Sequence, residues 1–169
     1  MFNIYLAGSV PKGDNEAVSF EDWREKYKQI LRNMDKSVSV INPYERGDNF
    51  NEGDFMAVFG SDCRDIKRSN LILVNAEERL GAGTAQELVI AKYLNKTVVT
   101  ILPKGTHHRR SKTYFRGRLI DDWIHPFIYA FSDIIIESLS DLDLVKIRKL
   151  KPKGIEVIDQ AINNVGNKD

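Results

Sequence analysis

Glu87 is the carboxylate of this sequence that is best placed to do chemistry, because it stands just inside a predicted helix after a glycine-rich turn. The helix is expected to begin at Thr84, and the turn before it reads L-G-A-G over residues 80–83. Residues 70–75 precede the turn and form a short apolar run, which is typical of a buried strand. Ligands of open α/β sheets bind at the carboxyl edge, where such a turn lies. The spacing therefore predicts a nucleophilic carboxylate at a sheet edge.

A second interpretation of Glu87 is purely structural. Thr84 and Glu87 form the pattern T-x-x-E of a capping box, in which the threonine hydroxyl and the carboxylate each accept a hydrogen bond from the other residue's backbone amide. Such a cap stabilises a helix by about 1 kcal/mol. Spacing alone leaves both interpretations open.

Composition and charge narrow the class of protein. The chain has 169 residues and a formal net charge of +1, which predicts one domain and no field that gathers nucleic acid or membrane surface. We therefore expect a small-molecule ligand. No apolar run approaches the roughly 20 residues of a membrane span, and the sequence goes directly into a strand rather than a leader. These features predict a cytoplasmic protein.

Cysteine and histidine usage argues against a disulfide and a metal site. Cys63 is the single cysteine, so no internal disulfide can form. The three histidines, His107, His108 and His125, do not stand with cysteines or acids at the spacing of zinc ligands. We therefore expect no built-in metal.

Apolar runs alternate along the chain with segments of helical periodicity. The predicted strands are residues 3–7, 37–41, 70–75, 97–102 and 133–137, and the predicted helices are 19–33, 54–69, 84–95 and 154–165. This alternation predicts an α/β fold in a single domain, with an open, doubly wound parallel sheet of about five strands of the flavodoxin or Rossmann type. The last helix follows a basic linker and is expected to close the fold.

Three other segments are assigned from local patterns. In the helix over residues 19–33, Trp23 and Tyr27 fall on the apolar face and Arg24 on the polar face, with Ser19 and Asp22 resembling its cap. Residues 44–53 are polar and predict a surface loop over the sheet edge. Trp23 and Trp123 are assigned to packing or to a subunit contact rather than to base stacking.

Residues 103–118 form the one strongly biased stretch of the chain. Its basic residues are Lys104, His107, His108, Arg109, Arg110, Lys112, Arg116 and Arg118. A charge run of this kind is either a solvated face or a basic loop or lid that meets a phosphate or a neighbouring subunit. Residues 119–131 after it are assigned to a helix that Pro126 disturbs.

Three strand ends converge on one edge of the predicted sheet, and together they resemble a known family. The pieces are I-Y-L-A-G-S near the amino terminus, D-I-x-x-S-N-L-I-L-V in the middle and G-x-G-T-A-Q-E-L-x-x-A after it. Their order and spacing resemble the nucleoside 2-deoxyribosyltransferase family and the related enzymes that hydrolyse deoxynucleoside 5′-monophosphates. The resemblance covers roughly residues 3–102.

The resemblance implies roles for particular residues. Glu87 matches the family's nucleophilic glutamate, Tyr5 matches the tyrosine that hydrogen-bonds it, and Asp65 matches the aspartate that binds the sugar or assists proton transfer. Tyr5 could equally be a packing residue of its strand, and Asp65 a solvated helix residue. The remaining substrate-binding candidates are Gly8, Ser9, Lys12, Asp62, Gly81, Gly83 and Ser111.

The implied chemistry is cleavage or exchange at an N-glycosidic bond without a cofactor. An adjacent carboxylate stabilises the oxocarbenium-like centre at C1′ and then traps it as a glycosyl-enzyme ester. Ser9 and Lys12 could bind a 5′-phosphate, and Ser111 falls near the serine that the hydrolases receive from a neighbouring subunit. A shallow site at a sheet edge favours a homodimer or larger homo-oligomer. Transfer, hydrolysis and a non-catalytic nucleotide sensor remain open. A dinucleotide-binding enzyme is disfavoured, since the first turn reads G-S-V-P-K-G rather than G-x-G-x-x-G.

Overall fold

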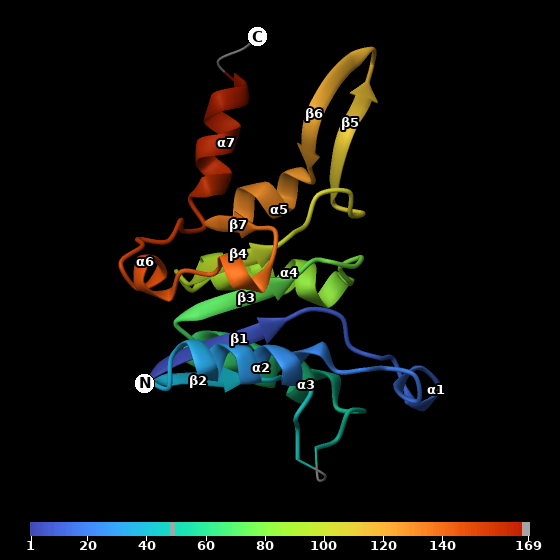
Figure 1. The fold of residues 1–169 in the computed structure, drawn as a ribbon, viewed down its shortest axis with the longest axis vertical. Helices are drawn as coiled ribbons and strands as arrows, with labels where there is room; N and C mark the ends of the chain where they lie inside the picture. The colour runs from blue at the N-terminus through green and yellow to red at the C-terminus, as the bar shows by residue number, and fades with distance from the viewer. Residues whose placement is uncertain (48–49, 167–169) are drawn as a thin grey trace.

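A five-stranded parallel sheet forms the centre of the molecule (Figure 1). The computed structural model describes residues 1–47 and 50–166. The strand order is β2 (Val38–Ile41), β1 (Phe2–Ala7), β3 (Leu71–Asn75), β4 (Thr97–Ile101) and β7 (Ile134–Ile136). Every neighbouring pair is parallel. The predicted fold class, an open and doubly wound α/β sheet of five strands, is confirmed.

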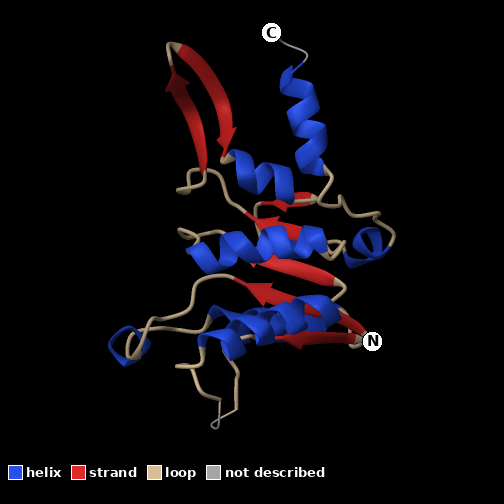
Figure 2. Cartoon of the chain, turned by 180° about the vertical axis from the view of Figure 1, so that it is seen from behind, coloured by secondary structure: helices blue, strands red, loops and turns tan. Residues whose placement is uncertain are grey.

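Helices cover both faces of the sheet (Figures 1 and 2). One face carries α2 (Trp23–Met34), the 3₁₀ turn η1 (Leu139–Asp141) and α6 (Leu144–Arg148), and the other carries α3 (Phe55–Arg68), α4 (Ala82–Tyr93) and α5 (Pro126–Phe131). A short helix α1 (Asp14–Ala17) follows β1, and α7 (Val157–Gly166) is the last element. Strands buried on both faces read as continuous apolar runs, which is why they could be found in the sequence.

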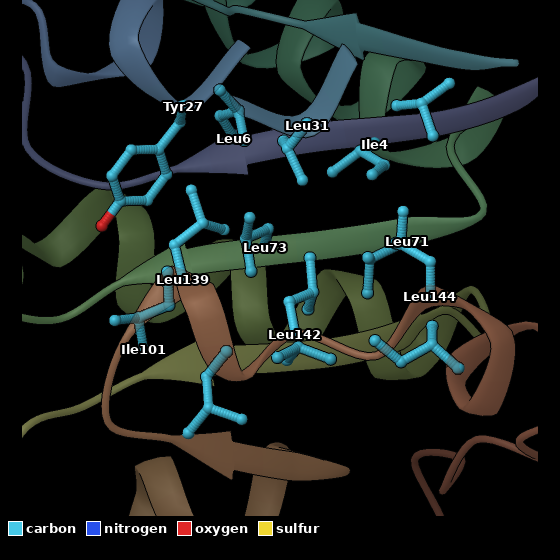
Figure 3. Packing of buried hydrophobic residues seen from close by; sticks show 14 residues of the cluster. Ile4, Leu6, Tyr27, Leu31, Leu71, Leu73, Ile101, Leu139, Leu142 and Leu144 are labelled. Carbon is cyan, nitrogen blue, oxygen red and sulfur yellow. The ribbon is translucent and has the colours of Figure 1, made fainter. Parts of the chain in front are cut away.

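Alternate residues of each strand supply two separate cores. Ile4 and Leu6 of β1 pack with Leu31 of α2 in the cluster shown in Figure 3. Tyr5 and Ala7 point to the opposite face and pack in the cluster that contains residues of α3 and α4. Because side chains of a strand alternate between the two faces of its sheet, the register of β1 directs Tyr5 toward α4.

Two predicted helices begin at other residues than expected. Asp22 caps α2 by accepting a hydrogen bond of 3.2 Å from the Arg24 amide, so Ser19 lies outside the helix. Gly81 is the N-cap residue of α4, which places Thr84 within the first turn. The predicted start of this helix at Thr84 is therefore wrong.

The second part of the basic segment, from Arg109 onward, belongs to a β-hairpin. Strands β5 (Arg109–Phe115) and β6 (Arg118–Ile124) pair antiparallel, and the two residues between them, Arg116 and Gly117, have φ angles of 49° and 77°. Two successive positive φ angles give the turn whose twist matches a two-stranded ribbon. The helix predicted over residues 119–131 is wrong in its first half, because it begins only at Pro126.

The last helix does not close the fold. α7 projects beyond the β7 edge of the sheet, on the same side of the molecule as the hairpin (Figure 1). Its apolar residues Ile158, Ile162 and Val165 are 41–66% exposed. The predicted surface loop over residues 44–53 is irregular where the structure describes it, and its residues 48 and 49 lie outside the described ranges.

Candidate active site

The site lies where the direction of the sheet's winding changes. The chain passes from β1 outward to β2 and then returns to β3 on the other side of β1, so the winding reverses between β1 and β3. Ligands of open α/β sheets bind at the carboxyl edge of such a switch point. Gly8 and Ser9 follow β1 at this edge, and the turn after β3 leads into α4. This topology brings Tyr5 of β1 and Glu87 of α4 together.

Tyr5 and Glu87 form a direct hydrogen bond. The Tyr5 hydroxyl donates to Oε1 of Glu87 at 2.5 Å, and the Tyr5 side chain is completely buried. Burial and the negative charge of Glu87 raise the pKa of Tyr5 far above its ordinary value, so the phenol keeps its proton and remains a donor.

The capping interpretation of Glu87 is wrong. A capping box requires Thr84 at the N-cap, but Gly81 occupies that position and no side chain caps the helix there. The Glu87 carboxylate instead accepts a hydrogen bond from Tyr5 of β1. Capping of α4 therefore does not explain the presence of Glu87 in the second turn of this helix.

The pKa of Glu87 lies close to neutral pH. Burial raises its pKa from 4.5 to about 7, and the negative charge of Asp62 adds to that increase. The Tyr5 hydrogen bond and the positive charges of Arg24 and Arg46 act in the opposite direction. A carboxyl group at a sheet edge whose pKa is shifted toward 7 by desolvation and by specific charged neighbours is typical of a functional site.

The two candidate aspartates of α3 lie in different surroundings. Asp62 is half-buried, forms an ion pair with Arg46, and raises the pKa of Glu87. Burial also raises the pKa of Asp62 itself. Asp65 lies nearly one turn further along α3, forms an ion pair of 3.1 Å with Arg68, and lines a groove of about 310 Å³ beside β2. Sequence reasoning preferred Asp65, whereas the electrostatics link Asp62 to Glu87.

The turn after β1 is shaped by the start of α2. A Cβ atom added to Gly8 would lie 2.6 Å from Cζ2 of Trp23, so only glycine fits there. Arg24, assigned to a polar face by its helical position, is fully buried and donates hydrogen bonds to the backbone carbonyls of Gly8 and Ser9. Lys12 is exposed further along the same turn. Sequence reasoning missed Arg24, since nothing in its spacing distinguishes it from a solvated arginine.

The turn before α4 contains two glycines with open space beside them, and the residue before them is held by a hydrogen bond. No atom lies within 4 Å of a Cβ added to Gly81 or Gly83, so there is room beside both glycines. The Leu80 amide donates a hydrogen bond of 3.0 Å to Nε2 of His108, and the sequence pattern did not predict this contact. Ser111 lies exposed on β5 in the projecting hairpin, at the far side of the sheet from β1 (Figure 1).

Residues 1–47 and 50–166 contain no group of three or more histidine, cysteine, aspartate or glutamate residues that could hold a metal ion. No helix in the same ranges is both long and apolar enough to cross a membrane.

Comparison with solved structures identifies the same fold in other proteins. A conserved protein from Enterococcus faecalis V583 has a TM-score of 0.62 at 16% identity, with 88% of this chain and 98% of that chain covered. A 2-deoxyribosyltransferase from Leishmania mexicana has a TM-score of 0.57 at 18% identity, covering 88% and 99%. A 2-deoxyribosyltransferase from the psychrotolerant bacterium Bacillus psychrosaccharolyticus has a TM-score of 0.54 at 20% identity, covering 90% and 97%.

These similarities establish the fold and nothing finer. No protein-family model matches the chain, and no curated protein sequence matches it. Function must therefore be argued from the site itself.

Proposed function

We propose that this protein acts on the N-glycosidic bond of 2′-deoxynucleosides or their 5′-monophosphates, in the manner of the nucleoside 2-deoxyribosyltransferase family. The observation that carries the proposal is the 2.5 Å hydrogen bond from Tyr5 to Glu87 at the carboxyl edge of the sheet. The shared fold with two proteins named as 2-deoxyribosyltransferases supports it. So does the pKa of Glu87, which leaves a nucleophilic carboxylate available near neutral pH.

In the first half-reaction, one oxygen of Glu87 attacks C1′ of the sugar while the bond from C1′ to the base breaks. The electron pair of the broken bond goes to the base nitrogen, which needs a proton in order to leave. We assign this proton to the Asp62 carboxyl group, because Asp62 acts electrostatically on Glu87 and Arg46 can pair with the carboxylate that remains once the proton has left. Tyr5 orients the attacking carboxylate.

In the second half-reaction, an acceptor attacks C1′ and releases the Glu87 carboxylate. An incoming base gives exchange, and water gives hydrolysis with free deoxyribose or its 5-phosphate as the product. Asp62, now ionised, takes the proton from the acceptor, which returns both carboxyl groups to their starting states.

The turn after β1 is the proposed position of the 5′ end of the substrate. The Ser9 hydroxyl and the Lys12 ammonium can bind a phosphate there, which favours monophosphates over free nucleosides.

A second copy of the chain completes the proposed assembly. The hairpin that carries Ser111 projects away from the body, so Ser111 can serve a site of this kind only in a neighbouring subunit. The exposed apolar residues of α7 also favour a homodimer or larger homo-oligomer.

The test is chromatographic detection of free base after incubation of the purified protein with a panel of deoxynucleosides and their 5′-monophosphates. Addition of a second base distinguishes exchange from hydrolysis. Glu87→Gln should abolish base release, whereas the matched control Glu78→Gln, which changes an exposed carboxylate of the turn before α4, should not. Retained turnover in Glu87→Gln overturns the mechanism, and binding without release by the native protein indicates a sensor.

A further inference from the structure

Arg24 is a completely buried arginine that binds backbone rather than solvent. Its Nε donates to the carbonyl of Leu6 at 3.2 Å, Nη2 donates to the carbonyl of Gly8 at 2.8 Å, and Nη1 donates to the carbonyl of Ser9 at 3.1 Å. The planar guanidinium presents five N–H donors in a fixed arrangement, so it can hold three carbonyls in one geometry. One side chain thus fixes the whole turn after β1.

The start of α2 supports this arrangement. Asp22 accepts a hydrogen bond of 3.2 Å from Nη1 of Arg24 and another of 2.9 Å from the Asn42 side chain. The Trp23 ring lies against Gly8 from the same helix. Burying an arginine carries a large desolvation penalty, and a single aspartate at the margin offsets only part of it. The backbone carbonyls of the turn supply the remaining stabilisation.

The direction of these carbonyls determines the direction of the amides that follow them. In a trans peptide unit the C=O and the next N–H point in opposite directions. The Gly8 and Ser9 carbonyls point toward Arg24, so the amides of Ser9 and Val10 point away from α2. Within the described residues, neither amide donates a hydrogen bond. Two neighbouring amides that point the same way and have no backbone acceptor are donors of the kind that bind an anionic oxygen.

We propose that Arg24 is a positioning residue, which holds the turn of Gly8 and Ser9 in the conformation that receives the 5′-phosphate of the substrate. Arg24 does not touch the substrate, because the turn lies between them. This inference rests on the proposed function for the identity of the ligand. The positive charge of Arg24 also lowers the pKa of Glu87, so one residue couples the turn after β1 to the nucleophile.

The experiment compares Arg24→Met and Arg24→Lys with a matched control, Lys92→Met. Lys92 is equally buried and pairs with Asp133 at the other end of α4. Both methionine variants therefore remove a buried cation, but only Arg24→Met releases the turn. Thermal unfolding of each variant establishes the temperature range in which it is folded.

Arg24→Met is expected to raise KM for a deoxynucleoside 5′-monophosphate at least tenfold, with kcat at the optimum pH changed less than threefold. The acid limb of its kcat/KM profile should move to higher pH. Arg24→Lys keeps the charge but loses the fork of donors, so its KM should be intermediate and its acid limb unchanged. Lys92→Met should keep the native KM and the native pH profile.

Two results overturn the inference. One is a native KM in both Arg24 variants, and the other is the same rise of KM in Lys92→Met. Should Arg24→Met fail to fold, Arg24→Lys decides the matter by its KM alone.

Failure of the proposed function is distinguished by a binding measurement in the Glu87→Gln background. Calorimetry with a deoxynucleoside 5′-monophosphate and the corresponding nucleoside needs no turnover. Adding Arg24→Met should weaken monophosphate binding at least tenfold and nucleoside binding less than threefold. Equal affinities with and without Arg24→Met refute the positioning role, whether or not the native protein releases a base.

Discussion

The Tyr5 hydroxyl donates its hydrogen bond to Oε1 of Glu87 across 82 positions of the sequence. The donor is a phenol that burial keeps protonated, and the acceptor is a carboxyl group whose pKa burial raises to about 7. The hydrogen bond stabilises the ionised form of Glu87 and orients it, while the low-polarity surroundings oppose ionisation. This balance sets the pH range in which Glu87 can act as a nucleophile.

Base release is expected to have an acid limb set by the ionisation of Glu87. Only the carboxylate form of Glu87 attacks C1′, so kcat/KM should rise about tenfold per pH unit as the pH approaches 7 from below. Initial rates measured from pH 5 to 9, at saturating and at limiting substrate concentrations, check this. An acid limb near pH 4.5, the ordinary value, would contradict the assigned nucleophile.

Tyr5→Phe should move this acid limb to higher pH. The variant removes a hydrogen bond that lowers the pKa of Glu87 and leaves the burial that raises it. Activity at pH 7 should fall at least tenfold, because a smaller fraction of Glu87 is ionised at that pH. The control is Tyr27→Phe, which removes a phenol that donates to Glu77 on the other side of the sheet and should leave the limb unchanged.

Glu87→Gln is expected to stabilise the protein at alkaline pH. The folded pKa of about 7 lies above the ordinary value of 4.5, so native stability is complete below pH 4.5 and falls as pH rises through 7. A glutamine avoids ionisation, and the gain should be on the order of 2 kcal/mol at pH 8. Urea unfolding at pH 8 and pH 4.5 checks it, since the gain must vanish at the lower pH.

His108→Phe should lower the free energy of unfolding at neutral pH and reduce the loss of stability at acidic pH. Nε2 of His108 accepts from the Leu80 amide, and burial lowers the pKa of His108 to about 4, so the ring is neutral in the folded state. Losing the acceptor should cost about 1 to 3 kcal/mol at pH 7.5.

The sign of the His108 effect follows from its lowered pKa. Stability from the neutral ring is complete above pH 6.5 and is lost as pH falls toward 4, because the unfolded state takes up the proton first. His108→Phe should lack this loss. His107→Phe, at an exposed neighbouring position, keeps the Leu80 contact and should retain the native stability at pH 7.5. Equal losses of stability in both variants at that pH would rule out the Leu80 contact as the cause.

Gly8→Ala should destabilise the protein by about 1 to 3 kcal/mol, because the new methyl group meets the Trp23 ring at 2.6 Å. The matched control is Gly60→Ala on α3, where no atom lies within 4 Å of an added Cβ. There the substitution should stabilise the helix by roughly 0.5–1 kcal/mol. Urea midpoints that move in the same direction for both variants would contradict the close contact.

Much of the sheet could be predicted because its strands are buried on both faces and therefore read as apolar runs. The hairpin could not, because β5 and β6 are largely exposed and carry charges that look like a loop. The turn of the hairpin depends on a positive φ at Arg116, and arginine is not a residue type that predicts such a turn.

The sequence by itself predicted the five strands of the parallel sheet and the helices that connect its first four strands, and hence the edge at which Glu87 and the turn after β1 must meet. It also singled out Glu87, Tyr5 and the two aspartates of α3, through their spacing and their resemblance to a family. Periodicity is a local property, so it carries this information without knowledge of the partners.

Only the tertiary structure decided between alternatives that local pattern leaves equal. It directed the Glu87 carboxylate to Tyr5 instead of Thr84, linked Asp62 to Glu87, and buried Arg24 on a nominally polar helix face. Each decision depends on contacts between segments far apart in the chain. Burial, which supplies the desolvation that raises the pKa of Glu87, exists only once those segments have packed together.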